Sequence, residues 1–144
     1  MTTPAGSDDP VGVLLVDKEA GLTSHDVVER ARRALGTRRT GHTGTLDPFA
    51  TGLLVLLAGV VTRLAEYFHL LDKTYDAVLR LGEETRTHDP EGETTRRSDA
   101  WREVGREELR AALAEHTGRL FQRPPAFSAK RIDGRRAHRA ARAG

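Results

Sequence analysis

A continuous run of nine apolar residues, from Leu53 to Val61, limits what this 144-residue chain can fold into. A membrane-spanning helix needs about 20 such residues, so this run is too short to cross a bilayer. Its start over 53–57 is instead typical of a buried strand. A second apolar run over 11–16 predicts another buried strand, so we expect a sheet with a hydrophobic core.

Helical patterns separate and follow these strands. Apolar residues at helical spacing predict a helix that has Ser24 as its N-cap and ends before Gly36. A second helix is predicted over 107–116, with leucines on its buried side, and an alternating pattern over 75–81 predicts a half-exposed strand. The run 135–143 has a basic helical pattern. This order of elements predicts an α+β fold with a mixed sheet.

Composition excludes several classes of protein. The sequence has no cysteine, which excludes a disulfide scaffold, a thiol nucleophile and a cysteine-ligated metal. Hydrophobic residues make up 38% and charged residues 31%, a balance typical of soluble globular proteins. Residues 1–10 are polar and lack an apolar stretch, so we expect a disordered leader rather than a signal peptide, and a cytoplasmic protein.

Charge is distributed unevenly along the chain. Residues 119–144 hold eight basic residues and one acidic residue, a net charge of +7, whereas residues 1–118 carry −5. A basic end on a mildly acidic body is expected of a protein that binds a polyanion such as nucleic acid. An arginine-rich, solvated helix would give the same pattern, and charge alone does not separate the two interpretations.

A Gly- and Thr-rich loop over 36–52 carries the densest set of candidate functional residues, and long loops inside compact domains are usually functional. Asp47 precedes Pro48, which restricts the aspartate backbone to an extended conformation and fixes the direction of its carboxylate. A positioned carboxylate can act as a nucleophile or a general base. His42 can stack on a base or donate a hydrogen bond. The alternative from chemistry alone is that Asp47 caps the next segment and His42 is an ordinary loop histidine.

Other catalytic motifs are missing from the sequence. No lysine follows Gly44 or Gly52 as a Walker A loop requires, and none of the four serines lies in a nucleophile elbow. The six histidines show neither an HExxH motif nor close pairing, so we expect no metal site.

Four collinear segments of the sequence resemble the pseudouridine synthases of the TruB type. They are GVLLVDKEAGLTS over 12–24, GHTGTLDPFATGLL over 41–54, a segment from Asp72 to Asp89, and a fourth in two pieces within 122–137. The resemblance covers residues 11–144. It implies the N-terminal portion of a pseudouridine synthase catalytic domain, with a mixed, mostly antiparallel sheet and flanking helices.

The resemblance also implies roles for individual residues. Asp47 would be the essential catalytic aspartate, His42 would enter the space that the flipped base leaves, and Tyr75 would pack on the flipped uracil. Thr43 and Gly44 would bind the substrate. Four basic residues would contact RNA phosphates or shape the site: Lys18, Arg38, Arg39 and Lys130.

The implied activity is an RNA modification in tRNA processing: an isomerase converts the T-loop uridine at position 55 of tRNA to pseudouridine. The N1–C1′ bond breaks, the uracil rotates, and C5 bonds to C1′, without a metal or organic cofactor. Asp47 would either abstract a ribose proton or attack C1′ or C6, and both routes stay open. The implied partner is the T-arm stem-loop of tRNA, with no membrane, and we expect a monomer.

The sequence departs from the family in two side chains and at its end. Glu19 and His138 stand where the family usually has proline and tyrosine. Family members continue beyond a segment like 139–144 with an arginine that pairs with the catalytic aspartate, so we expect a C-terminally truncated synthase. An active isomerase and a non-catalytic RNA-binding remnant are therefore both open. A third possibility is a protein-interaction module whose basic end docks on an acidic partner.

Overall fold

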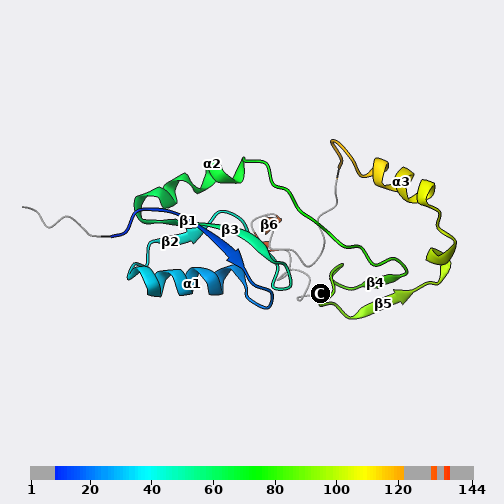
Figure 1. Ribbon diagram of the computed structural model, residues 1–144, viewed down its shortest axis with the longest axis horizontal. Coiled ribbons are helices and arrows are strands. Elements are labelled where there is room, and N and C mark those ends of the chain that lie inside the picture. The colour runs from blue at the N-terminus through cyan, green and yellow to red at the C-terminus, as the bar shows by residue number, and fades with distance from the viewer. Residues whose placement is uncertain (1–8, 122–130, 133–134, 137–144) are drawn as a thin grey trace, which may run out of the picture. The chain divides into compact units, whose positions relative to one another are not determined.

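The chain folds into two compact units, Met1–Asp76 and Ala77–Gly144, and each unit is described by itself. A computed structural model describes residues 9–121, 131–132 and 135–136 (Figure 1). Both units contain antiparallel strands, and helices accompany the strands in each, which confirms the predicted α+β fold class.

A three-stranded antiparallel sheet forms the centre of the first unit (Figure 1). Its middle strand is β3, and the three strands are β1 (Gly12–Lys18), β2 (Thr40–His42) and β3 (Gly52–Ala58). The whole of β1 pairs with the whole of β3, so that Lys18 lies opposite Gly52. Both apolar runs of the sequence thus form strands, as predicted.

Helix α1 (Ser24–Leu35) packs against one face of this sheet (Figure 1). Its Val27 and Val28 are buried against Leu54 and Leu56 of β3, and partly buried side chains complete the core: Leu14, Val16, Leu22, Ala31 and Leu46. The helix ends at Gly36, whose φ of 66° is the left-handed conformation that glycine adopts most easily. The predicted end of this helix is therefore confirmed.

The start of α1 differs from the prediction by one residue. Thr23, not Ser24, is the N-cap: its Oγ1 accepts a hydrogen bond from the backbone N–H of Asp26 at 3.1 Å. In return, the carboxylate of Asp26 accepts from the backbone N–H of Thr23 at 2.8 Å. This reciprocal capping box gives the backbone N–H groups of Thr23 and Asp26 their hydrogen-bond acceptors. The hydroxyl of Ser24 is therefore available for another partner.

The loop predicted over 36–52 is shorter than expected, because strand β2 lies within it. Arg32 of α1 donates a hydrogen bond to the carbonyl oxygen of Thr40 at 2.9 Å and so joins the helix to this strand. After β3 the chain continues through a 3-10 helix, η1 (Gly59–Leu64), into the short helix α2 (Ala65–His69).

The second unit holds short elements. A hairpin pairs β4 (Glu83–Thr85) with β5 (Thr94–Arg97), and a second pairs β6 (Arg131–Ile132) with β7 (Arg135–Arg136). Between them in the sequence lie a 3-10 helix, η2 (Ala100–Glu103), and helix α3 (Arg106–Glu115). Within the described ranges, no helix of either unit has the length and hydropathy needed to cross a membrane.

Two expectations about the chain after residue 74 are wrong, and a third is contradicted only at its first two residues. Residues 75–81 form no strand, because alternation alone does not supply a hydrogen-bonded neighbour and no described strand pairs with them. Helix α3 lies where it was predicted, but its Leu109 and Leu113 are exposed rather than buried. The predicted basic helix over 135–143 begins in strand β7, and its residues 137–143 lie outside the described part.

We expect Leu56→Ala to lower the free energy of unfolding by about 2–5 kcal/mol, because it leaves a cavity in the core around a side chain that is 0% exposed. Leu15→Ala is the matched control on β1, since Leu15 is 71% exposed, and should change stability by less than about 0.5 kcal/mol. Urea unfolding of both variants measures the difference. Equal effects would contradict the assignment of the core to the α1 face of the sheet.

Candidate active site

The candidate catalytic residue Asp47 lies in the loop between β2 and β3, and its side chain is exposed to solvent. The residue before it, Leu46, is half-buried and packs against the core under α1. The residue after it, Pro48, is also half-buried. The loop thus exposes one carboxylate next to a leucine that packs against the core.

Ser24 holds the backbone on the N-terminal side of Asp47. Its Oγ accepts a hydrogen bond from the N–H of Leu46 at 2.9 Å and donates one to the carbonyl oxygen of Leu46 at 3.2 Å. Ser24 itself is only 2% exposed. Both polar backbone groups of Leu46 are therefore tied to the first residue of α1.

Lys18 and Gly21 hold the backbone on the C-terminal side of Asp47. The carbonyl oxygen of Pro48 accepts a hydrogen bond from the N–H of Gly21 at 2.8 Å and one from Lys18 Nζ at 3.2 Å. Gly21 has a φ of 85°, so a side chain at this position would strain the turn. Asp47 thus sits between two residues whose backbones are anchored.

The ammonium of Lys18 is buried and fully used inside the protein. Besides the bond to Pro48, Nζ donates to the carbonyl oxygens of Leu22 at 2.7 Å and Glu19 at 3.1 Å, and the residue is 1% exposed. No carboxylate of the described residues forms an ion pair with it. Contact with an RNA phosphate would break these bonds, so the geometry favours the other role considered for Lys18, shaping the site.

His42 lies at the end of β2 with its ring half-buried. Burial lowers the pKa of His42 below its ordinary value of 6.5, and a contact with the Gly44 backbone opposes the shift only in part. Its Nδ1 is buried and has no hydrogen-bond partner among the residues described. The imidazole is therefore held in its neutral form near neutral pH.

Thr43 and Gly44 continue from His42 into the loop. Thr43 is buried, and its N–H and hydroxyl donate to the carbonyl oxygen of Val55 at 3.0 and 3.4 Å. The Cβ position at Gly44 would lie 4.0 Å from Cε of Lys73, an ordinary contact distance. Thr43 therefore fixes the start of the loop to β3, and its hydroxyl is already in use.

The other predicted site residues are exposed or outside the described part. Tyr75 is 67% exposed and lies in a segment without regular structure. Arg38 and Arg39 are exposed in the turn between α1 and β2. Lys130 lies outside the described residues. The structure therefore gathers Ser24, Lys18 and Asp47 at one loop, and the hydrogen bonds of the described residues do not join Tyr75 to that loop.

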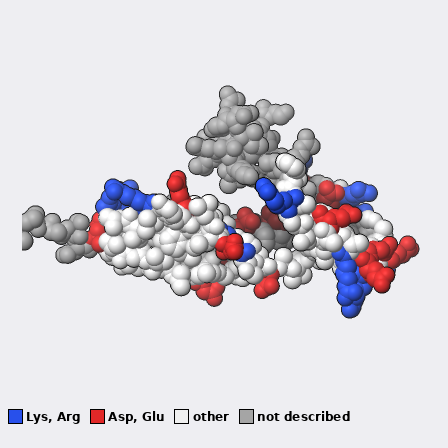
Figure 2. Space-filling model, turned by 90° about the horizontal axis from the view of Figure 1, so that it is seen from above, with Lys and Arg blue, Asp and Glu red and all other residues white. Residues whose placement is uncertain are grey.

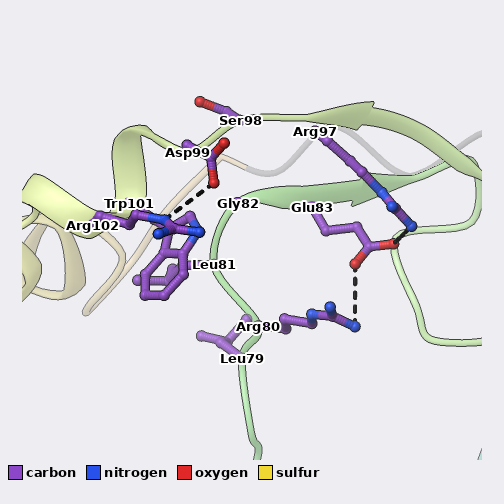
Figure 3. A pocket seen from close by; sticks show the side chains of 10 residues that line it. All are labelled: Leu79, Arg80, Leu81, Gly82, Glu83, Arg97, Ser98, Asp99, Trp101 and Arg102. Atoms are coloured by element: carbon purple, nitrogen blue, oxygen red, sulfur yellow. Dashed lines mark hydrogen bonds and ion pairs between the residues drawn. The ribbon is translucent and has the colours of Figure 1, made fainter.

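A pocket in the second unit holds none of the predicted site residues (Figure 3). Its charged side chains pair with one another: Glu83 with Arg80 at 3.2 Å and Arg97 at 3.3 Å, and Asp99 with Arg102 at 3.2 Å. The guanidinium of Arg102 also lies 5.6 Å from the ring centre of Trp101. Because these charges are already paired, the pocket is a weaker candidate than the Asp47 loop.

On the face drawn in Figure 2, charged side chains are distributed differently over the two units. Figure 2 shows that the drawn face of the first unit carries few charged side chains, whereas the second unit presents basic and acidic side chains together. In the first unit, Arg30, Arg33, Arg38 and Arg39 are exposed, and none of them forms an ion pair with another described residue.

Comparison with known proteins identifies the family. Residues 32–144 match the model of the TruB family pseudouridylate synthase (N terminal domain), which is most of the chain. The chain belongs to this family. The resemblance found in the sequence motifs is thereby confirmed.

Curated relatives extend the match toward the N-terminus. The chain is similar to the tRNA pseudouridine synthase B of Thermobifida fusca, with 51% identity over 133 residues, which are 92% of this chain and 45% of the relative. The protein of the same name from Aquifex aeolicus is 45% identical over 133 residues, with 92% and 46% covered. The chain spans about half the length of the curated relatives it matches.

We expect Lys18→Met to lower the free energy of unfolding by about 1–3 kcal/mol, because it removes the ammonium group that donates hydrogen bonds to the carbonyl oxygens of Leu22 and Pro48. Lys73→Met is the matched control: Lys73 Nζ also donates to two carbonyls, but on the surface, so its loss should cost less than about 0.5 kcal/mol. Urea unfolding compares the two. A loss no larger for Lys18 than for Lys73 would argue against the buried clamp.

Burial of His42 predicts a pH-dependent stability. Because its pKa is lower in the folded chain than the ordinary 6.5, the unfolded chain binds more protons between the two values. The stability that neutral His42 contributes to the folded chain is fully present above pH 6.5, and it is lost as the pH falls through the pKa that His42 has in the folded chain. Urea unfolding at about pH 7.5 and about pH 5.5 should show a smaller decrease for His42→Gln than for the wild type. An identical decrease would contradict the predicted shift, and titration of the ring protons by NMR measures the shift directly.

Proposed function

We propose that residues 11–144 form the N-terminal part of a catalytic domain that converts the T-loop uridine at position 55 of tRNA to pseudouridine. Membership of the pseudouridylate synthase family supports the reaction, and the printed name of the relatives supports tRNA as the substrate. The observation that carries the proposal is the Asp47 loop: an exposed carboxylate on a backbone anchored on both sides.

The proposed reaction is an isomerisation at one nucleotide. The N1–C1′ bond breaks, the uracil rotates, C5 bonds to C1′, C5 loses a proton and N1 gains one, so no electrons are exchanged with another molecule. Asp47 starts the reaction, either as a base toward a ribose proton or as a nucleophile toward C1′ or C6. Both roles require a carboxylate that reaches out of the protein while its backbone stays in place, which fits the exposed Asp47.

Access to the uridine is proposed to require base flipping, because the reacting atoms are enclosed in the folded T-loop. Flipping costs a few kcal/mol in lost stacking, and an aromatic surface such as the exposed ring of Tyr75 returns about 1–3 kcal/mol per stacked base. His42 is proposed to fill the vacated space. Its lowered pKa suits that role, since a neutral ring stacks without carrying a charge into the RNA.

Binding of the RNA backbone is assigned to exposed arginines. Arg38 and Arg39 beside β2, with Arg30 and Arg33 on α1, have no ion-pair partner among the described residues and are free to meet phosphates. Lys130 joins them by its place in the family motif. We also propose that the protein works as a monomer in the cytoplasm, where tRNA is found. Binding of this kind weakens steeply as salt rises.

Conversion of a T-arm stem-loop RNA to pseudouridine by the chain tests the proposal. Asp47→Ala should lower the rate by about 10²–10⁴-fold or more, because it removes the proposed base or nucleophile. Asp17→Ala is the matched control, since Asp17 is another exposed aspartate of the first unit and lies outside the site. The wild type, Asp47→Ala and Asp17→Ala should retain nearly the same amount of RNA on a filter, and this amount should fall with added salt.

The outcomes separate the candidate functions. Product that disappears only with Asp47→Ala supports the proposed reaction in these 144 residues. Salt-sensitive retention without product would identify the chain as a non-catalytic RNA-binding part of a synthase. Folded protein that neither retains RNA nor makes product would reject both functions, provided that the Thermobifida fusca relative is active in the same assay.

A further inference from the structure

We propose that Ser24 is a positioning residue for Asp47, which acts by fixing the backbone of Leu46. The inference rests on the proposed function, in which Asp47 is the reactive group. It assigns a buried hydroxyl on α1 to the geometry of a carboxylate that lies 23 positions later in the sequence.

The hydroxyl of Ser24 both donates and accepts a hydrogen bond, and both bonds are made with Leu46. Its Oγ accepts from the N–H of Leu46 at 2.9 Å and donates to the carbonyl oxygen of the same residue at 3.2 Å. A hydroxyl can do both at once, whereas a methyl group can do neither. Because Ser24 is 2% exposed, water has little access to replace these bonds if the hydroxyl is removed.

The hydroxyl of Ser24 has no competing duty at the helix start. A serine at this place would ordinarily cap the helix, but Thr23 and Asp26 already form the capping box. Stability of α1 and position of the Asp47 loop therefore depend on two different hydroxyls in neighbouring residues. This separation lets the two roles be tested independently.

The peptide group that Ser24 anchors leads directly into Asp47. The carbonyl of Leu46 belongs to the peptide bond that joins it to Asp47, so a shift of that group moves the carboxylate. The remaining anchors hold the far side of Asp47: Lys18 and Gly21 bind the carbonyl oxygen of Pro48, and the N–H of Ala50 donates to the carbonyl oxygen of Asp47 at 3.1 Å. Loss of the near anchor should misplace the carboxylate, and a misplacement of about 1 Å can slow a reaction on the order of 100-fold.

The experiment compares Ser24→Ala with Thr23→Ala, which removes a hydroxyl one residue away and leaves the bonds to Leu46 in place. Ser24→Ala should lower kcat on the T-arm stem-loop by about 10- to 100-fold and leave KM nearly unchanged, since the exposed arginines and Tyr75 are untouched. Thr23→Ala removes the helix cap, so it should lower the free energy of unfolding about as much as Ser24→Ala does. It should leave kcat within about twofold of the wild-type value. Ser24→Thr, which keeps a hydroxyl, should recover part of the lost kcat.

A second measurement does not depend on turnover. Amide hydrogen exchange at Leu46 should speed up by about tenfold in Ser24→Ala, since its N–H loses its acceptor, and should stay near the wild-type rate in Thr23→Ala. Equal changes in both variants would show that fraying of α1, not the Leu46 contact, is responsible, and would overturn the proposal. Faster exchange with an unchanged kcat would overturn it as well.

Failure of the inference and failure of the proposed function look different. If the wild type makes product and Ser24→Ala makes it at the same rate, only the positioning role is rejected. No product from either the wild type or Asp47→Ala rejects the proposed function, and the positioning role is rejected with it.

Discussion

The geometry of the first unit depends on the hydrogen bonds that the ammonium of Lys18 donates. Lys18 ends strand β1 on the face that α1 covers, and its three bonds to carbonyl oxygens join the turn after β1 to the loop after Asp47. A buried cation is costly unless its donors are satisfied, and here backbone oxygens satisfy them. The ammonium of Lys18 thereby joins the end of β1 to the loop at Pro48, 30 positions later in the sequence.

The start of α1 completes this arrangement through a division of tasks between adjacent hydroxyls. Thr23 caps the helix and Ser24 binds the loop, so the helix that covers the core also fixes the residue before Asp47. The capping box with Asp26 makes this possible, because a helix with only one capping candidate would use Ser24 for itself. Packing, helix capping and the candidate site thus share one short stretch of chain.

Sequence patterns predicted the parts of the fold that depend on local burial. The apolar runs indicated β1 and β3, and Gly36 indicated the end of α1, because each signal lies in the segment itself. The strand expected over 75–81 failed since a strand also requires a neighbour, and the three residues of β2 are too few to show a pattern. Burial of the α3 leucines failed for the same reason: an amphipathic helix predicts a buried side only where something covers it.

The sequence named candidates for the site but did not indicate which contacts their side chains make. The motif pointed to Asp47 and to Lys18, yet only the structure shows that Lys18 lies on the same side of β1 as Leu14 and Val16, where it is buried and binds carbonyl oxygens. Ser24 carried a sequence signal as well, but capping propensity assigned its hydroxyl to the helix. The signal that separates the two uses is the preceding Thr23, followed three residues later by Asp26. A second capping candidate beside a serine in a functional motif indicates that the serine hydroxyl is free for tertiary contact, because the threonine and the aspartate already satisfy the helix start between them.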